Sequence, residues 1–305
     1  MSASAKIYTE LADLQRLRFS AHGYSFTAAQ PVNSILAGNN VSKLRGRGLN
    51  FEELRHYRPG DDIRSMDWKV TRRTGKPHIK VYTEERERNI YLLVDQRQSM
   101  FFGNQTAMKS VMAAEVAALI AWTISETGDR LGALVFNDDS VNAVTPRRGK
   151  PHVLHVLNTI VDYNHALAAR YQAENASDSI NRPLAKVNQL SHHNGLVILI
   201  TDGIGWTEQS TTLIKNLRRH NEVIACHIYV PLEINLPHME NMVVSNGEQQ
   251  IQFSSKSQKI RTDFSQHRDE KLSAFTQMAK KYRIPVLSFS TDKASDKQLR
   301  KMLGG

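Results

Sequence analysis

Short, almost wholly apolar runs alternate with amphipathic stretches from residue 89 onward, and this alternation limits the possible folds more than any other feature. The clearest runs are NIYLLVD at 89–95 and GLVILITD at 195–202. Apolar runs without polar alternation are typical of strands buried on both faces, as in parallel sheets covered by helices. We therefore predict a doubly wound, mostly parallel α/β sheet.

The other elements of the series follow from the same patterns. Helices are predicted over 106–127, 152–161, 183–191, 207–220 and 257–282, and strands over 132–136, 223–230 and 284–290. An edge strand is expected over 141–144, and Asn246-Gly247 predicts the turn of a hairpin over 241–254.

Residues 1–88 lack this alternation. They contain a predicted helix over 6–18, an irregular Gly- and Arg-rich stretch, and a predicted strand over 78–83. We expect two parts: 1–88 as an N-terminal extension without a second core of its own, and 89–305 as the sheet domain.

Two acids, Asp95 and Asp202, end the strongest predicted strands. Open α/β sheets bind ligands outside the carboxyl ends of their strands. The sequences Asp95-Gln-Arg97-Gln-Ser99 and Ile-Thr-Asp202-Gly resemble the metal-ion-dependent adhesion site of von Willebrand A domains. There a D-x-S-x-S loop, with a later Thr and Asp, holds Mg²⁺ through hard oxygen ligands.

The match departs from that motif at two positions. Arg97 stands where the first serine belongs, and only Ser177 and Ser179 offer a hydroxyl near the expected threonine. The alternatives are a degenerate metal site of Asp95, Ser99 and Asp202, or a structural cluster in which a guanidinium neutralises the acids. Arg97 favours the cluster, so we expect no cofactor, Mg²⁺ included.

A second motif, FEELRHYRPGDDIRSMDWK, covers residues 51–69. It resembles the hallmark of domain-of-unknown-function family fifty-eight, and the resemblance extends over about residues 40–230. The resemblance implies a von Willebrand A-like domain. It also implies association with MoxR-type AAA+ ATPases and their client proteins in protein maturation or remodelling.

Cations and anions alternate along this motif. Pro59-Gly60 predicts a turn, and Asp61 or Asp62 can cap the element after that turn. Trp68 is predicted to be a packing anchor. Two interpretations stay open: an ion-pair lattice holding the extension on the sheet domain, or a partner-binding surface. The residues concerned are Arg55, Arg58, Asp61, Asp62, Arg64, Asp67 and Trp68.

The net charge of +10 is concentrated at the two ends of the chain. Residues 1–89 carry 16 Lys/Arg and 10 Asp/Glu, residues 90–254 carry 12 and 15, and residues 255–305 carry 12 and 5. Basic ends can contact nucleic acid, acidic proteins or anionic membranes. A basic nucleic-acid-associated protein is the alternative function, but no nucleic-acid-binding motif supports it.

Compartment is predicted from three features. The single cysteine, Cys226, excludes an intrachain disulfide framework, and the first residues are polar. The longest apolar stretch, 111–124, is too short to span a bilayer. We expect a cytoplasmic protein with no membrane insertion.

Catalytic constellations are missing from the sequence. It contains no G-x-S-x-G, C-x-x-C or H-E-x-x-H motif, and Met108 replaces the second glycine in a near match to a phosphate loop. We predict a non-enzymatic protein-interaction module that binds partners at the carboxyl ends of the strands, unless the aromatic residues there are buried. The predicted partner-binding residues are Asp95, Arg97, Ser99, Phe101, Phe102, Asp202 and Trp206.

Overall fold

The computed structural model describes residues 6–21, 50–83, 88–104, 106–168, 179–191, 193–234, 242–245, 250–253 and 272–303. The chain divides into two compact units. One joins Met1–Ala37 to Arg88–Gly305 and contains the large sheet, and the other is Gly38–Glu87. We call them the sheet unit and the small unit.

The sheet unit has six strands in the order β10-β7-β6-β3-β4-β5. Only the β4–β5 pair is antiparallel, which confirms the predicted doubly wound, mostly parallel sheet and the edge strand. The chain runs from β3 outward to β5 and returns to pair β6 on the other side of β3. The strand order therefore reverses between β3 and β6. The strands are β3 Asn89–Asp95, β4 Arg130–Phe136, β5 Val141–Arg147, β6 Leu196–Thr201, β7 Glu222–Tyr229 and β10 Val286–Ser290.

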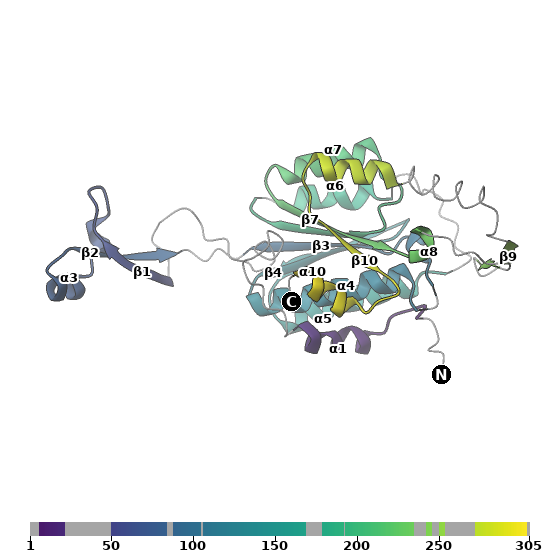
Figure 1. The fold of residues 1–305 in the computed structure, drawn as a ribbon, viewed down its shortest axis with the longest axis horizontal. Coiled ribbons are helices and arrows are strands. Elements are labelled where there is room, and N and C mark those ends of the chain that lie inside the picture. The colour runs from purple at the N-terminus through teal and green to yellow at the C-terminus, as the bar shows by residue number, and fades with distance from the viewer. Residues whose placement is uncertain are drawn as a thin grey trace. The chain divides into compact units, whose positions relative to one another are not determined.

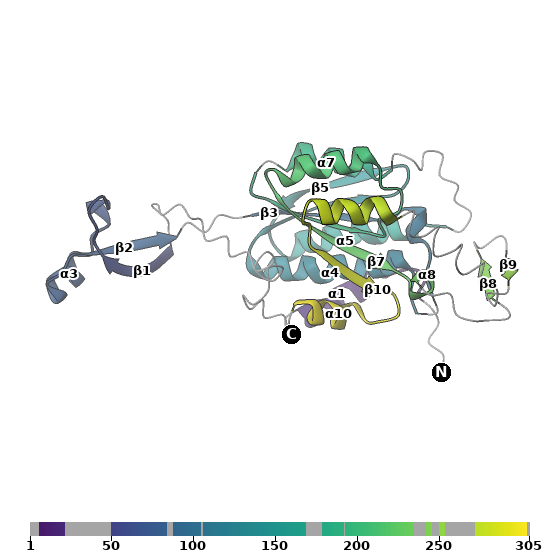
Figure 2. The same ribbon diagram turned by 45° about the horizontal axis from the view of Figure 1, so that its top comes forward.

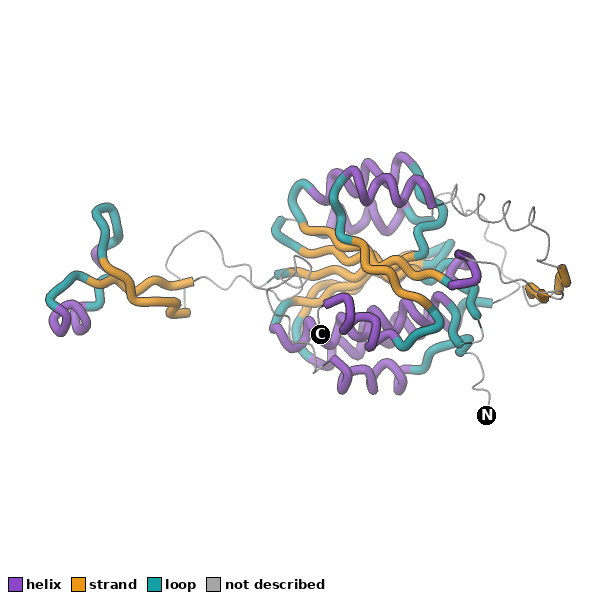
Figure 3. The backbone as a smooth tube through the Cα atoms, viewed as in Figure 1, coloured by secondary structure: helices purple, strands orange, loops and turns teal. Residues whose placement is uncertain are grey.

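Helices cover both faces of the sheet, which lies between two helical layers (Figures 1 and 3). On one face lie α1 Leu11–Ala21, α4 Lys109–Thr127, α5 Lys150–His165 and α10 Ser295–Leu303. On the other face lie α6 Asn181–Leu190, α7 Glu208–Arg218 and the helix 272–281. Of the predicted helix 257–282, residues 257–271 lie outside the described residues.

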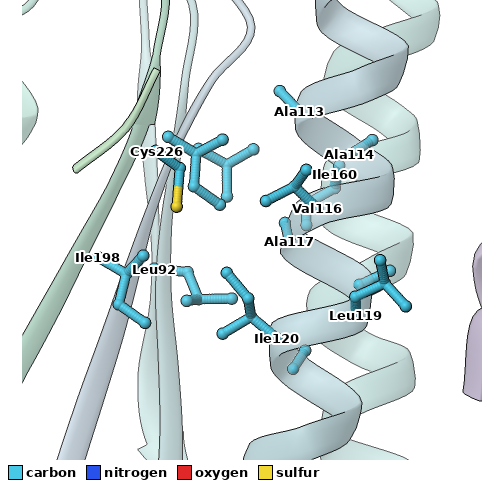
Figure 4. Packing of buried hydrophobic residues seen from close by; sticks show 14 of the residues in the cluster. Leu92, Ala113, Ala114, Val116, Ala117, Leu119, Ile120, Ile160, Ile198 and Cys226 are labelled. Atoms are coloured by element: carbon cyan, nitrogen blue, oxygen red, sulfur yellow. The ribbon is translucent and has the colours of Figure 1, made fainter. Parts of the chain in front are cut away.

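The centre of the core is α4, which is buried along most of its length. Its side chains Val116 and Ile120 lie between the helix and the strands that carry Leu92 and Cys226 (Figure 4). Burial raises the pKa of the Cys226 thiol to about 12. The cysteine is therefore an inert part of the core.

The N-terminal helix α1 packs on the outer side of α4 (Figure 2). The buried Leu14 accepts a hydrogen bond at its carbonyl from Nε1 of Trp122 at 3.0 Å. The start of the described chain also joins the unit, since Lys6 pairs with Ala107 in a short parallel bridge. These contacts join residues 6–21, which the sequence assigns to the N-terminal extension, to the sheet unit.

The small unit is an antiparallel hairpin of β1 Asn50–His56 and β2 His78–Thr83, whose connection carries η1 Ile63–Ser65 and α3 Trp68–Thr74. The sequence predicted β2 but neither β1 nor α3. Residues 38–87 cluster as a separate compact unit.

The remaining elements are short: η2 Gln98–Met100, α8 Pro231–Ile234 and the antiparallel pair β8 Met242–Ser245 and β9 Gln250–Phe253. The pair confirms the predicted hairpin, while its turn at Asn246-Gly247 lies outside the described residues. None of the helices in the described part of the chain has the length and apolar character needed to cross a membrane.

Candidate functional site

The two strand-end acids meet at the reversal of strand order. Strand β3 ends at Asp95 and β6 at Thr201, and the two strands pair in parallel register. The hydroxyl of Thr201 donates to Oδ2 of Asp95 at 2.7 Å, and Asp202 follows at once. Both carboxylates are buried, with 0% and 2% exposure. Burying two carboxylates requires compensating charge.

Arg97 supplies part of that charge. Its Nε lies 3.0 and 3.1 Å from the two carboxylate oxygens of Asp95, and its Nη2 lies 2.6 Å from Oδ2. The same Nη2 lies 3.7 Å from Oδ1 of Asp202. The guanidinium is itself 3% exposed. The predicted Arg–Asp cluster at the strand ends is thus present in the structure.

The turn after Asp202 is shaped to receive Arg97. Gly203 and Gly205 have φ values of 74° and 79°, in the left-handed region that favours glycine. A Cβ atom at Gly205 would lie 3.3 Å from Nη1 of Arg97. Between them the carbonyl of Ile204 accepts from Nη2 of Arg97 at 3.1 Å. The glycines let the backbone come close to the guanidinium.

A second buried cation, Lys109, was missed by the sequence analysis. Its Nζ lies 3.0 Å from Oδ2 of Asp202, its exposure is 1%, and it also lies over the ring of Phe102. Lys109 is the first residue of α4, where the sequence shows only the lysine of a failed phosphate loop. The sequence did contain a signal for Lys109: it is a single lysine at the start of an apolar helix, directly after the Asp95 loop.

The charges on the cluster set its titration. Burial by itself raises the pKa of Asp202, but Lys109 and Arg97 outweigh it and hold that pKa well below its usual range. Burial opposes the charge on Arg97, and Asp95 more than offsets this, so the pKa of Arg97 is raised. Asp138 differs, since burial raises its pKa although it accepts from the backbone N–H of Gln98 at 2.6 Å.

These residues do not fit a magnesium ion. Both carboxylates already bind cations of the chain, and a divalent ion would be repelled by Arg97 and Lys109. Ser179, one candidate for the adhesion-site threonine, accepts instead from Nη1 of Arg97 at 3.4 Å. The Oγ of Ser99 is buried and has no hydrogen-bond partner among the described residues. Ser177 lies outside the described residues.

A buried amide chain links the Asp95 loop to the N-terminal segment. Gln96 donates to the carbonyl of Ser110 and accepts from the amide of Asn164, both at 3.0 Å. Asn164 in turn accepts from the backbone N–H of Thr9 at 2.9 Å. These hydrogen bonds hold the Asp95 loop in place. Buried polar groups that were only partly hydrogen-bonded would not fix it in this way.

The three predicted aromatic anchors separate into two kinds. Trp206 is 7% exposed, packs edge-on against Phe275 at 5.2 Å and donates from Nε1 to Thr211 at 3.0 Å. It is a core residue, and the expectation of an exposed anchor was wrong for it. Phe101 and Phe102 are half-buried and lie at the edge of the cluster, with Phe101 5.7 Å from the ring of Tyr8.

The acids of the second motif hold the small unit together internally. Asp61 accepts from both terminal nitrogens of Arg55 at 2.7 and 2.8 Å and from the backbone N–H of Arg58, and the fork with Arg55 lowers its pKa to about 2. Asp62 caps η1, as predicted for one acid of the pair. Asp67 caps α3 and pairs with Lys80 at 3.3 Å.

Trp68 is not a packing anchor inside the small unit, because 66% of its surface is exposed within the described structure. The ion pairs of Asp61 with Arg55 and of Asp67 with Lys80 form within the small unit. Arg58 and Arg64 are exposed. These two cations of the motif therefore lie on the surface of the small unit.

Three comparisons relate the chain to other proteins. The model of the family described as "Protein of unknown function DUF58" matches residues 53–273. Uncharacterized proteins of Mycobacterium tuberculosis and Mycobacterium bovis are 30% identical over 284 residues, which is 92% of this chain and 87% of theirs.

Solved structures of low sequence identity also align with the chain. An aerotolerance-related membrane protein of Bacteroides fragilis aligns at 10% identity and a TM-score of 0.42, over 71% of this chain and 96% of that one. BatB of Bacteroides thetaiotaomicron aligns at 12% identity and 0.40, over 72% and 100%. A von Willebrand factor type A protein of Catenulispora acidiphila aligns at 14% identity and 0.31, over 49% and 35%.

Proposed function

Since the chain belongs to the DUF58 family, we propose that it is a cytoplasmic protein-interaction module that acts as adaptor or co-chaperone of a MoxR-type AAA+ ATPase. It would present client proteins to that ATPase for maturation or remodelling. Its own contribution would be binding, without a chemical step.

The observation that carries this proposal is the double neutralisation of the strand-end acids. Arg97 and Lys109 bind Asp95 and Asp202 at 2.6–3.0 Å in a buried setting. Open α/β sheets usually bind their ligands at this position. Here the charged side chains pair with one another and form a fixed scaffold. The half-buried Phe101 and Phe102 lie at its edge, and aromatic side chains of this kind serve as interface anchors.

The direct test is binding to the MoxR-type ATPase of the same organism, purified separately and measured by biolayer interferometry with ATP, ADP or no nucleotide. The wild-type chain should bind in at least one nucleotide state. The variant Phe101→Ala/Phe102→Ala should lose affinity by about tenfold or more. Phe19→Ala is the matched control, because Phe19 is an aromatic residue of α1 with 80% exposure.

Two results would overturn the proposal. One is the absence of binding in every nucleotide state. The other is tight binding of random duplex DNA that persists at physiological salt, which would favour the nucleic-acid alternative, since purely electrostatic contacts weaken steeply with salt.

A further inference from the structure

One side of helix α3 in the small unit is an exposed surface without a partner in the described structure. Trp68 is 66% exposed, and Lys69, Arg72 and Arg73 are exposed as well. At 3.6 residues per turn these four positions fall within one arc of about 140° on the helix. The single aromatic ring lies at one edge of this arc, and the three cations occupy the rest of it. We call this the α3 face.

The opposite side of α3 is the one that packs. The hydroxyl of Thr71 accepts from the backbone N–H of His78 at 3.0 Å, and that of Thr74 lies 3.2 Å from Nδ1 of the same histidine. Val70 and Thr71 are half-buried. Contacts with β2 therefore fix the orientation of the helix and leave the α3 face outward.

The acids near α3 are already committed inside the unit. Asp61 is bound by Arg55, and Asp67 by Lys80 and the backbone N–H of Val70. Asp62 accepts from the backbone N–H of Arg64. Within residues 50–83, no ion pair neutralises Lys69, Arg72 or Arg73. The face therefore presents net positive charge beside an exposed aromatic ring.

We propose that the α3 face binds an acidic segment of a partner protein that carries an apolar side chain for Trp68. This rests on the proposed function in one respect only, that the chain works by binding proteins. Guanidinium groups pair with carboxylates through two parallel hydrogen bonds. Tryptophan and arginine are the residues that most often dominate the affinity of protein interfaces.

Other features of the small unit favour a protein over a nucleic acid as the occupant. Ile63 and Leu54 are 58% and 39% exposed, and aliphatic side chains suit protein partners better than stacked bases. Single-strand binding sites stack successive bases on several aromatic rings, whereas the α3 face offers one.

The chain carries a built-in reporter for this site. Of its three tryptophans, Trp122 and Trp206 are 4% and 7% exposed, so Trp68 alone is open to solvent. Ligand binding at the α3 face should shift the emission of Trp68 to shorter wavelength and protect it from acrylamide quenching. Trp68→Ala should remove both signals.

The experiment titrates the full chain with a short synthetic peptide rich in Glu and Asp around a Phe-Leu pair. A peptide of the same length with Gln and Asn in place of the acids is the neutral probe. The acidic peptide should bind at least tenfold more tightly, and its affinity should fall with added salt. In fluorescence anisotropy with labelled peptide, Trp68→Ala should weaken binding about thirtyfold, and Arg72→Gln/Arg73→Gln about tenfold.

Matched controls come from the sheet unit. Phe19→Ala removes an aromatic ring that is 80% exposed, and Lys297→Gln/Lys301→Gln removes two exposed cations of α10. Equal losses in the control and α3 variants would overturn the proposal. Tighter binding of single-stranded DNA than of the acidic peptide, through the same residues, would replace it with a nucleic-acid site.

Three further outcomes separate this inference from neighbouring explanations. A large drop in melting temperature in Trp68→Ala would mean that the face is covered by the chain itself, which overturns the proposal. If the ATPase binds wild type and α3 variants equally and the peptide does not bind, the proposed function stands and this inference fails. If the peptide binds at α3 but the ATPase does not bind at all, the reverse holds.

Discussion

The Nζ atom of Lys109 lies 3.0 Å from Oδ2 of Asp202, although 93 residues separate them in the chain. With Arg97 on Asp95, this contact makes a buried group of two anions and two cations. Removing one partner of a buried ion pair costs far more than the pair contributes, because the other charge stays buried and uncompensated.

Lys109→Met should therefore lower the free energy of unfolding by about 3–5 kcal/mol, measured by urea denaturation at neutral pH. Lys109→Met/Asp202→Asn should recover much of the loss, because it removes both charges. Lys297→Met is the control for an exposed lysine and should change stability by less than about 0.5 kcal/mol. A single variant as stable as that control would contradict the assigned ion pair.

The ion-pair cluster also predicts that divalent metal does not change the thermal stability of the protein. Thermal melts of the wild type with excess Mg²⁺ and with EDTA should coincide, since a specifically bound ion would stabilise the native state by mass action. Arg97→Ser alone should leave Lys109 on Asp202 and gain little Mg²⁺ binding. Arg97→Ser/Lys109→Ala frees both carboxylates, and calorimetry should detect Mg²⁺ only there. A rise of several degrees for the wild type in Mg²⁺ would refute this.

Acid should destabilise the sheet unit through Asp202. Its pKa in the fold is held below the unfolded value of about 3.9. Its contribution is therefore fully present above that value and is lost as the pH falls through the lower folded pKa. Denaturation series should show a steeper loss of stability below about pH 4 in the wild type than in Lys109→Met/Asp202→Asn. Parallel curves would exclude Asp202 as a source of acid sensitivity.

Trp206 is expected to behave as a core residue. Trp206→Ala should cost about 3–5 kcal/mol, whereas Phe102→Ala should cost much less because its ring is half-buried. Trp206→Phe keeps most of the contact with Phe275 but loses the hydrogen bond to Thr211, so it should fall in between. Chemical denaturation of the three variants gives the ranking. A near-neutral Trp206→Ala would place the ring at the surface.

We expect the N-cap residue of α3, Asp67, to keep the small unit ordered. Asp67→Ala removes the acceptor for the backbone N–H of Val70 and the partner of Lys80. Limited trypsinolysis should then cut faster at Arg72 and Arg73, while the melting temperature of the sheet unit stays the same. Asp62→Ala, which affects only η1, is the comparison. Equal cutting rates in Asp67→Ala and wild type would mean that the cap is dispensable.

The two central strands, β3 and β6, could be predicted because each is a nearly continuous apolar run that ends at a polar residue. The predicted strand 89–95 matches β3 at both ends. Asp95 and Asp202 were placed together for the same reason, since parallel neighbours bring their carboxyl ends to one edge. Local patterns of this kind predict the fold class and the approximate position of the site.

Lys109, Trp68 and α1 could not be placed because their roles depend on contacts distant in sequence. Lys109 reads locally as the start of a helix, and only the folded chain puts it on Asp202. Trp68 reads as core material because of its size, yet 66% of its surface is exposed within the described structure. The covering of α4 by α1 likewise depends on the Leu14–Trp122 contact.

The seating of α1 has a consequence for biosynthesis. The hydroxyl of Ser20 in α1 lies 3.3 Å from Oδ2 of Asp296 in α10, and Ser295 donates to Glu115 of α4 at 2.8 Å. The first helix and the last are therefore fastened to each other and to the same central helix. A ribosome delivers α1 early and α10 late, and domains are completed as their segments emerge. Ribosome-held chains that end before residue 295 should keep the contact of α1 with α4 through Leu14 and Trp122 but lack the hydrogen bonds of Ser20 and Ser295, so α10 adds its fastening last.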